Sequence, residues 1–224
     1  MTFEVANKCL EKRRRNGYID KDDTLSRQHR TTVMEGKFIL TIEELQENGL
    51  FNNFIVNNMS TLSINLIRGI AIYAAREMNR CNRFIIVGFT ACKLCIDERD
   101  EIFRCTSKYS RDGQWYDWCL IEWVNAALIS LTYPGLILGF IQVEEKYCAV
   151  VQLSNDPISM EKMTHKFICK FNLPSNTPTS VVEIDSISNP LCVFKNYGGS
   201  ESEYFCALPQ KKWSRYFGDK IEIP

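Results

Sequence analysis

The stretch Tyr109 to Trp123, which reads YSRDGQWYDWCLIEW, decides the fold that this sequence predicts. Arg111-Asp112-Gly113 marks a turn, because Asp tolerates turn geometry and Gly adopts positive φ freely. The aromatic and branched residues that follow are typical of a β-strand, in which alternate residues share a face. One face would carry Trp115, Asp117, Cys119, Ile121 and Trp123, and the other would carry Tyr116, Trp118, Leu120, Glu122 and Val124. Because both faces are largely apolar, we expect a strand covered on both sides, as in a small barrel.

Similar apolar runs continue to the C-terminus and alternate with turn signals such as Pro134-Gly135 and Ser188-Asn189-Pro190. The runs are Ile102 to Cys105, Trp115 to Val124, Leu136 to Val143, Tyr147 to Leu153, His165 to Phe171, Val181 to Ile184, Leu191 to Phe194 and Tyr204 to Leu208. Short strands at this spacing predict an all-β barrel or sandwich. Glu144-Glu145-Lys146 is short enough to join its two neighbours as a hairpin.

Local signals before residue 100 are less regular. Thr41 to Gly49 predicts a helix, with Thr41 as the N-cap and Glu44 three residues later as in a capping box. Asn52 to Ser60 is typical of a loop, and Phe84 to Phe89 predicts a buried strand. Ile67 to Ala74 fits either helical or strand spacing, and we favour a strand. At the other end of the chain, Lys211 to Phe217 predicts a brief helix.

The chain divides into three parts: a polar basic arm over residues 1–35, a segment over 36–100 that completes the barrel or forms a small lobe, and the barrel over 101–224. The arm carries the cluster Lys12-Arg13-Arg14-Arg15, which is either solvated charge or a nuclear-import or phosphate-contacting signal.

Composition narrows the class of protein. The 224 residues are 45% hydrophobic and 12% aromatic, which is ample for a core. With 27 basic and 27 acidic residues the net charge is zero, which argues against coating nucleic acid along the whole surface. Since no run resembles a signal peptide or a membrane span, we expect a cytosolic or nuclear protein whose ten cysteines are reduced.

Five segments together resemble a bromo-adjacent homology (BAH) domain over roughly residues 100–217: WYDWCLIEW, YPGLILGFI, YCAVVQL, VVEIDSISNPLCVF and YFCALPQKKW. The chain is also similar to BAH-like segments encoded in mobile elements. The resemblance implies a mainly β fold, a twisted small β-barrel (BAH-like) with a few short helices. It further implies a non-enzymatic interaction module in the nucleus that binds a protein, a histone tail or a nucleosome surface, with no cofactor and no membrane.

Some members of that family read methylated lysine with an aromatic cage, in which two or three rings surround a cation. The candidates here are Tyr109, Tyr116, Trp118 and Tyr147, and Asp117 or Glu122 would add a carboxylate. The alternative is that these aromatics fill the core, as large aromatic side chains usually do.

A zinc site would need four ligands. Cys92 and Cys95 form a C-x-x-C pair, and Cys81 and Cys105 would complete four thiolates. Because no second close pair accompanies them, incidental spacing is the better interpretation, and we expect no metal. Neither His29 nor His165 lies beside a nucleophile motif, so we predict no enzymatic activity.

The alternative function is a nucleic-acid-binding accessory protein of mobile-element origin. Phosphate contact needs clusters of basic residues, and stacking on bases needs exposed rings. The candidate clusters are Lys12, Arg13, Arg14 and Arg15 in the arm, and Lys211, Lys212 and Arg215 near the C-terminus, with a smaller group at Arg104, Lys108, Tyr109 and Arg111. Each cluster is small enough to be ordinary solvated charge.

Overall fold

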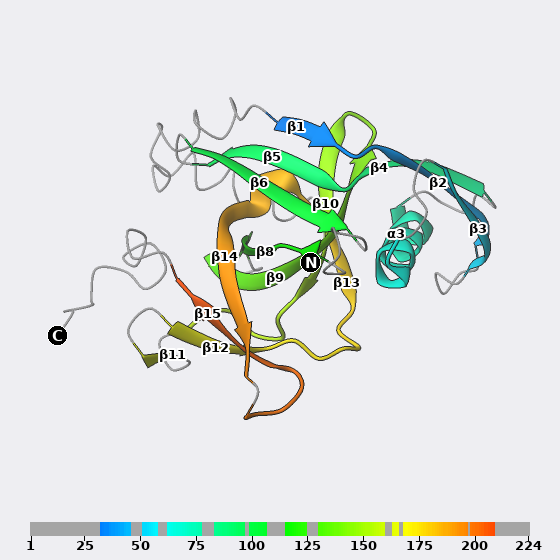
Figure 1. Ribbon diagram of the computed structural model, residues 1–224. Helices are drawn as coiled ribbons and strands as arrows, with labels where there is room; N and C mark the ends of the chain where they lie inside the picture. The colour runs from blue at the N-terminus through cyan, green and yellow to red at the C-terminus, as the bar shows by residue number, and fades with distance from the viewer. Residues whose placement is uncertain are drawn as a thin grey trace.

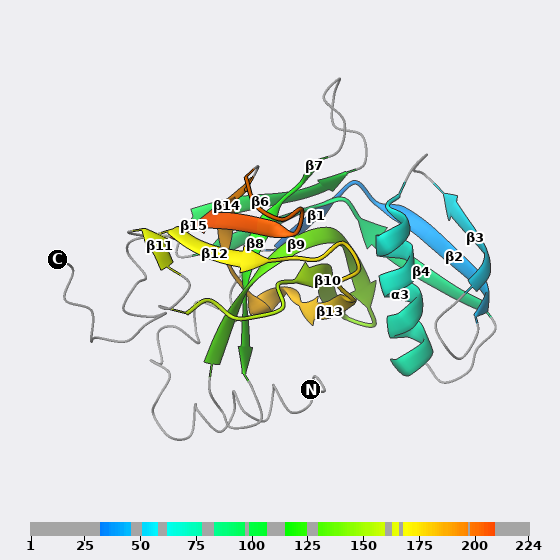
Figure 2. The same cartoon turned by 90° about the horizontal axis from the view of Figure 1, so that it is seen from below.

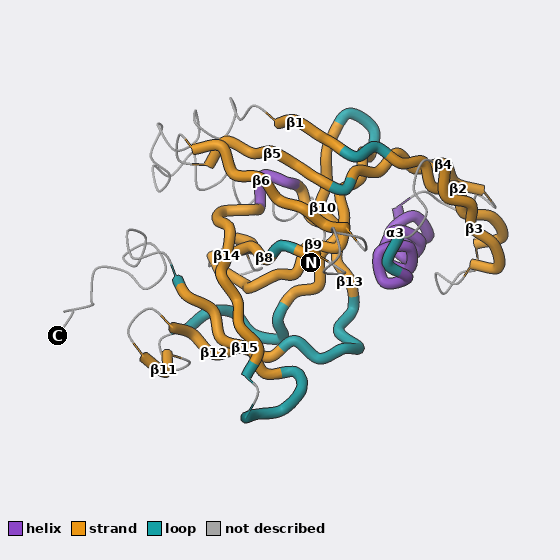
Figure 3. The backbone as a smooth tube through the Cα atoms, viewed as in Figure 1, coloured by secondary structure: helices purple, strands orange, loops and turns teal. Residues whose placement is uncertain are grey.

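Strands occur in all eight segments predicted after residue 100, but two of the segments are each divided between two strands. Trp115 to Val124 is divided at Asp117, and His165 to Phe171 belongs to two strands that pair antiparallel. The computed structural model describes residues 32–45, 51–57, 62–77, 83–96, 99–106, 115–124, 130–159, 163–165, 168–196 and 198–208. Strands make up most of this backbone (Figures 1 and 3). Those after residue 97 are β6 (Arg99–Thr106), β7 (Trp115–Tyr116), β8 (Trp118–Val124), β9 (Ser130–Val143), β10 (Lys146–Leu153), β11 (Met163–His165), β12 (Ile168–Asn172), β13 (Thr179–Glu183), β14 (Ile187–Lys195) and β15 (Glu203–Ala207), with a 3-10 helix, η3 (Ile184–Ser186), before β14.

The predicted hairpin is also confirmed, because β9 and β10 pair antiparallel across Glu144 and Glu145. Glu144 has a φ of 54°, the left-handed conformation that a tight hairpin turn requires.

The described part of the N-terminal half contains five strands and a helix: β1 (Thr32–Glu35), β2 (Phe38–Leu45), β3 (Phe51–Asn57), α3 (Ile64–Glu77), β4 (Arg83–Phe89) and β5 (Ala91–Ile96). The strand predicted at Phe84 to Phe89 is confirmed as β4, but it is not buried throughout, because Ile85 is 65% exposed. The helix predicted from Thr41 is wrong, because residues up to Leu45 belong to β2, and the loop predicted from Asn52 is wrong up to Asn57. β2 pairs with β3 on one side and β4 on the other. Tertiary pairing has overridden the local capping signal.

The strand favoured at Ile67 to Ala74 is wrong as well, because this stretch lies within α3. The helical spacing is the one observed, because Leu66, Ile67, Ile70, Ala71 and Ala74 form one buried face. This face shares a core with residues of β2, β4, β9 and β10. Figures 1 and 2 show α3 lying beside β2, β3 and β4. Gly69 is a point of close contact between α3 and β13. A Cβ there would lie 2.5 Å from Oγ1 of Thr179, so only glycine lets the helix approach β13 this closely.

Two sheets hold the strands together. One has four strands in the order β1-β5-β6-β7. The other has eleven, in the order β11-β12-β15-β14-β8-β9-β4-β2-β3, with β10 and β13 branching from β9. Between described residues, β3, β11 and β13 each pair with one neighbour, so these pairings do not close into a barrel.

β8 separates two of the three hydrophobic cores. Cys119 and Ile121 are fully buried in the core shared with β5, β6 and β9, whereas Leu120, on the opposite face, belongs to the smaller core under β12, β14 and β15. The expected strand covered on both sides is therefore confirmed. The third core lies beneath α3. Within the described ranges, no helix has the length and apolarity needed to cross a membrane.

Candidate docking face around Trp115

Asp117 interrupts the predicted long strand and joins three elements. It lies between β7 and β8, where its backbone N–H donates to Arg104 O at 2.9 Å and its carbonyl accepts from Ile137 N at 3.0 Å. Its carboxylate Oδ2 accepts from Arg104 N at 2.6 Å. A charged acceptor forms stronger hydrogen bonds than a neutral one, so Asp117 firmly connects β6, β7 and β9 at one point.

The other carboxylate oxygen of Asp117 fixes a tryptophan. Trp115 Nε1 donates to Asp117 Oδ1 at 2.8 Å, and Trp115 pairs with Thr106 at the edge of the four-stranded sheet. The prediction that Trp115 and Asp117 share a strand face is therefore confirmed. Trp115 nevertheless keeps 47% of its surface exposed. The result is a large aromatic side chain held in one orientation while it remains in contact with solvent.

Exposed apolar residues accompany Trp115 on the same side of this sheet. Phe103 and Cys105 of β6 point into the core, so the alternate residues Ile102 and Arg104 point outward. Cross-strand pairing places Val33, Lys93 and Ile102 side by side in one row. Val33 is 43% exposed and Ile102 is 46% exposed. We call the outward side of β1, β5, β6 and β7 the docking face; it contains Val33, Glu35, Lys93, Asp100, Ile102, Arg104 and Trp115.

The charges on the docking face are balanced. Lys93 Nζ lies 2.6 Å from Asp100 Oδ2, and this partner raises the pKa of Lys93. Glu35 and Arg104 flank Ala91 in the neighbouring row, one on each side. The face therefore offers apolar groups between opposite charges rather than a field of one sign.

Trp118, only three residues after Trp115, has a different environment. Its ring contacts Phe171 at a centroid distance of 5.6 Å and Tyr204 at 5.4 Å. Phe171 and Tyr204 are themselves stacked at 5.7 Å as direct partners of β12 and β15. The three rings fill the space between one another and pack on the C-terminal core. This arrangement is that of an aromatic cluster packed on a core, as large aromatic side chains usually are.

Among the predicted cage residues that the structure describes, Trp118 lies apart from Tyr116 and Tyr147. Tyr116 and Tyr147 both pack on the core of β5, β6 and β9, where Tyr147 contacts Phe89 edge-on at 5.9 Å. Trp118 pairs with Leu136 at one part of β9, whereas Tyr147 pairs with Gln142, six residues further along the same strand. Strand geometry separates those two positions by roughly 20 Å. Burial raises the pKa of Tyr116. Tyr109 lies outside the described residues.

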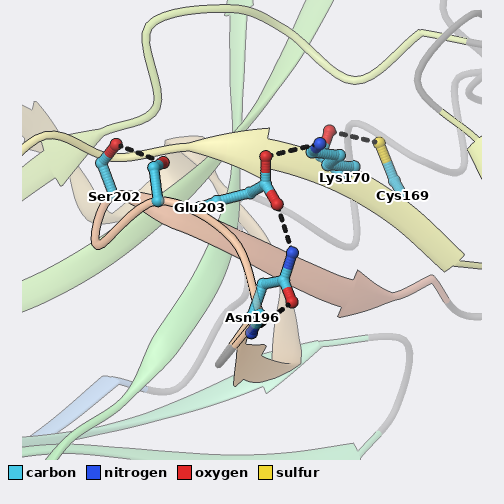
Figure 4. Close-up of polar contacts among 7 residues, drawn as sticks. Cys169, Lys170, Asn196, Ser202 and Glu203 are labelled. Atoms are coloured by element: carbon cyan, nitrogen blue, oxygen red, sulfur yellow. Dashed lines mark hydrogen bonds and ion pairs between the residues drawn. The ribbon is translucent and has the colours of Figure 1, made fainter.

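A polar network joins β12, β15 and the loop before β15, in the part of the eleven-stranded sheet formed by β11, β12, β15 and β14, here called the C-terminal sheet (Figure 4). Because Lys170 precedes Phe171 and Glu203 precedes Tyr204, strand alternation places the network on the face opposite the Trp118 cluster. Lys170 Nζ lies 2.5 Å from Glu203 Oε1, and the Asn196 side chain donates to Glu203 Oε2. Lys170, followed by Asn196, holds the pKa of Glu203 below its usual value of 4.5. Asn196 Oδ1 also accepts from Gly198 N at 3.2 Å, so the network secures the loop between β14 and β15.

The candidate zinc ligands are not arranged around one point. Cys92 is buried in β5, whereas Cys95, three residues later, lies on the opposite face. Burial raises the pKa of Cys92 to about 12 and that of Cys105 well above its usual value. Among the described residues, no three His, Cys, Asp or Glu side chains form a metal-binding group.

Several predicted sites fall outside the described residues. They are Cys81, the basic residues Lys12, Arg13, Arg14, Arg15, Lys211, Lys212 and Arg215, and the predicted helix at Lys211 to Phe217.

No protein-family model matches this chain, and no curated protein or solved structure is significantly similar to it. The BAH-like assignment therefore stays a prediction from the residues quoted for it.

Proposed function

We propose that this chain is a non-enzymatic protein-recognition module that binds its partner through the docking face. The observation that carries the proposal is the geometry of Trp115, which is half exposed while its indole N–H is bonded to Asp117. An exposed tryptophan needs a reason to be held in place, and a rigid anchor for a partner pocket is the simplest one.

The energetics of association favour such an anchor. Tryptophan and arginine dominate the binding energy of protein interfaces, and Trp115 lies beside the exposed Arg104. Because Asp117 already fixes the indole, binding costs little additional side-chain entropy. Val33 and Ile102 extend the apolar contact, and the Lys93–Asp100 pair supplies a polar rim.

The balanced charge of the docking face indicates a protein partner rather than nucleic acid. Binding along a phosphate backbone depends on a surplus of Lys and Arg. Here Asp100 lies against Lys93, and Glu35 accompanies Arg104 in the adjacent row. The fitting partner is a protein surface that presents an apolar pocket bordered by polar groups.

The resemblance to BAH domains supplies the finer part of the proposal. From this resemblance we propose that the partner is a histone tail or a nucleosome surface in the nucleus. We also propose that the strands after residue 100 form a twisted barrel. The mainly β architecture and the doubly covered β8 support that assignment. Amide hydrogens protected from exchange along the outer edges of β11 and β13 would support closure, whereas rapidly exchanging edges would contradict it.

The test compares substitutions of two aromatic residues that are about equally exposed but lie on different surfaces of the protein. Trp115→Ala alters the docking face, and Phe194→Ala alters β14, where Phe194 is 44% exposed. Both variants and the parent protein are used to capture core histones and mononucleosomes from nuclear extract, with and without nuclease. Purified mononucleosomes then give the affinity of each protein. We expect Trp115→Ala to weaken binding by at least roughly tenfold and Phe194→Ala to leave it unchanged.

Three results would contradict parts of the proposal. Equal binding by Trp115→Ala and the parent protein would exclude the docking face. Naked DNA of mononucleosome length that binds the parent protein as tightly as mononucleosomes do would favour the nucleic-acid alternative. Binding of the parent protein to neither histones nor nucleosomes would exclude the chromatin partner.

A further inference from the structure

Two cysteines face each other across neighbouring strands of the C-terminal sheet. Cys169 of β12 and Cys206 of β15 are direct antiparallel partners, and both side chains are fully buried in the same core. No other two cysteines among the described residues are paired in this way. Direct partners in an antiparallel pair have Cα atoms about 4.5 or 5.5 Å apart. Both spacings lie within the range of roughly 4.4–6.8 Å that a disulfide spans.

We propose that Cys169 and Cys206 form a dithiol site that is oxidised to an intrachain disulfide and thereby locks β12 to β15. The disulfide would hold together the aromatic cluster of Trp118. Phe171 and Tyr204, which stack on one another, are paired two positions further along the same ladder and lie on the same face as the two thiols. A bond between Cys169 and Cys206 holds those two rings at a fixed separation and keeps Trp118 packed against them.

The reaction requires an oxidant of the small-molecule disulfide class, such as oxidised glutathione. One protein thiol loses its proton and attacks a sulfur of the oxidant, which forms a mixed disulfide and releases one glutathione thiolate. The second protein thiol loses its proton and attacks the protein sulfur of the mixed disulfide, which releases the second glutathione thiolate. Two electrons pass to the oxidant, and the two protons are taken up by the released thiolates. Two protein thiols become one disulfide, while one small disulfide becomes two thiols.

Burial makes the reaction dependent on local opening. The hydrogen bond with Cys169, followed by burial, raises the pKa of Cys206, so the closed sheet presents no reactive thiolate. Among the described residues, β12 has only the three-residue β11 on its outer side, so the end of this sheet is a place where strands separate at low cost. We therefore expect slow oxidation in native buffer and faster oxidation at denaturant concentrations below the unfolding transition.

The nearby Cys192 supplies a matched control. It is exposed on β14, where it pairs with Ala207 rather than with Cys206, so its side chain lies on the other face of the sheet. The protein is incubated with oxidised glutathione, remaining thiols are alkylated under denaturing conditions, and peptides are mapped by mass spectrometry. We expect a Cys169–Cys206 linkage in the parent protein and in Cys192→Ser, and none in Cys206→Ser. The linkage should raise Tm by on the order of 5–10 °C.

Each other result overturns the proposal. Reduced Cys169 and Cys206 throughout the denaturant series would show that the pair does not oxidise. A linkage through Cys192 would show that the facing arrangement does not direct the chemistry. A Cys169–Cys206 bond that leaves Tm unchanged would show that the bond does not lock the sheet. Because Cys169→Ser, like Cys206→Ser, could weaken the core, linkage in Cys192→Ser and the parent protein carries the decision.

Discussion

Trp115 and Trp118 are separated by only two residues in the sequence, yet they belong to regions with opposite properties. Trp115 belongs to the four-stranded sheet, where Asp117 fixes it while nearly half of it stays exposed. Trp118 belongs to β8 of the eleven-stranded sheet, where Phe171 and Tyr204 pack against its ring. Aromatic composition alone does not distinguish a binding residue from a core residue. The partner that each ring contacts makes the distinction, a carboxylate in one case and two further rings in the other.

The largest expected effect is on the C-terminal region. Trp118→Ala removes a ring that contacts Phe171 and Tyr204, and should lower the free energy of unfolding by about 3 kcal/mol. Urea denaturation followed by far-UV circular dichroism measures the change. Trp118→Phe, which keeps an aromatic ring, should lose much less. A Trp118→Ala protein as stable as its parent would show that the cluster is not part of the core.

The junction between the two regions should show the next largest effect. Asp117→Ala removes the carboxylate that accepts from Arg104 N and Trp115 Nε1, and should cost about 2 kcal/mol of stability. The same variant frees the indole, so partner affinity should fall although Trp115 is still present. Asp117→Asn retains one acceptor oxygen and should lie between the parent and the alanine variant in denaturant titrations. Equal affinity of all three proteins would contradict the role of Asp117 in fixing Trp115.

A smaller effect on stability is expected at Trp115 itself. Because the side chain is half exposed, Trp115→Ala should change the free energy of unfolding by less than about 1 kcal/mol while it weakens partner binding. The difference between the stability losses of Trp115→Ala and Trp118→Ala compares the two regions most directly. A loss of stability as large as that of Trp118→Ala would place Trp115 in the core and remove the docking face.

The smallest expected effect is the loss of stability at acidic pH through Glu203. The ion pair with Lys170 lowers the pKa of Glu203, so the ionised carboxylate stabilises the fold above the usual value of 4.5, and this stabilisation is lost as the pH falls through the lowered pKa. The Tm difference between the parent protein and Glu203→Gln should therefore be constant near neutral pH and shrink below pH 4.5. A difference that stays constant down to the acid transition would contradict this coupling.

Much of the C-terminal fold follows from the sequence because period-two patterns and turn residues are local signals. Glu144 and Glu145 form the predicted turn, and Cys119, Leu120 and Ile121 are buried on both faces as expected. The N-terminal half could not be predicted in this way. The capping pattern at Thr41 is genuine as a local preference, but pairing of β2 with β3 and β4 outweighs it. Around Ile70 the spacing of apolar residues fits a helix and a strand equally well. The helix forms because its apolar face packs in a core with residues of β2, β4, β9 and β10.

The candidate site was only partly visible in the sequence. The W-x-D spacing of Trp115 and Asp117 predicts a shared face, which the hydrogen bond confirms. The exposure of Trp115 depends on the edge position of β7, which no local pattern indicates. Phe171 and Tyr204 were missed as partners of Trp118 because they are more than 50 residues away in the chain, and β12 and β15 bring them there. Strand alternation was a usable signal for Cys92 and Cys95, because a separation of three residues places two side chains on opposite faces.

Hydroxyl-radical footprinting of the parent protein, alone and bound to mononucleosomes, tests the central claim most directly. Oxidation of individual tryptophans, read by mass spectrometry, reports the solvent access of Trp115 and Trp118 in one experiment. We predict that Trp115 reacts readily in the free protein and is protected in the complex, whereas Trp118 reacts slowly in both. Unchanged reactivity of Trp115 in the complex, or protection of Trp118 instead, would contradict the account.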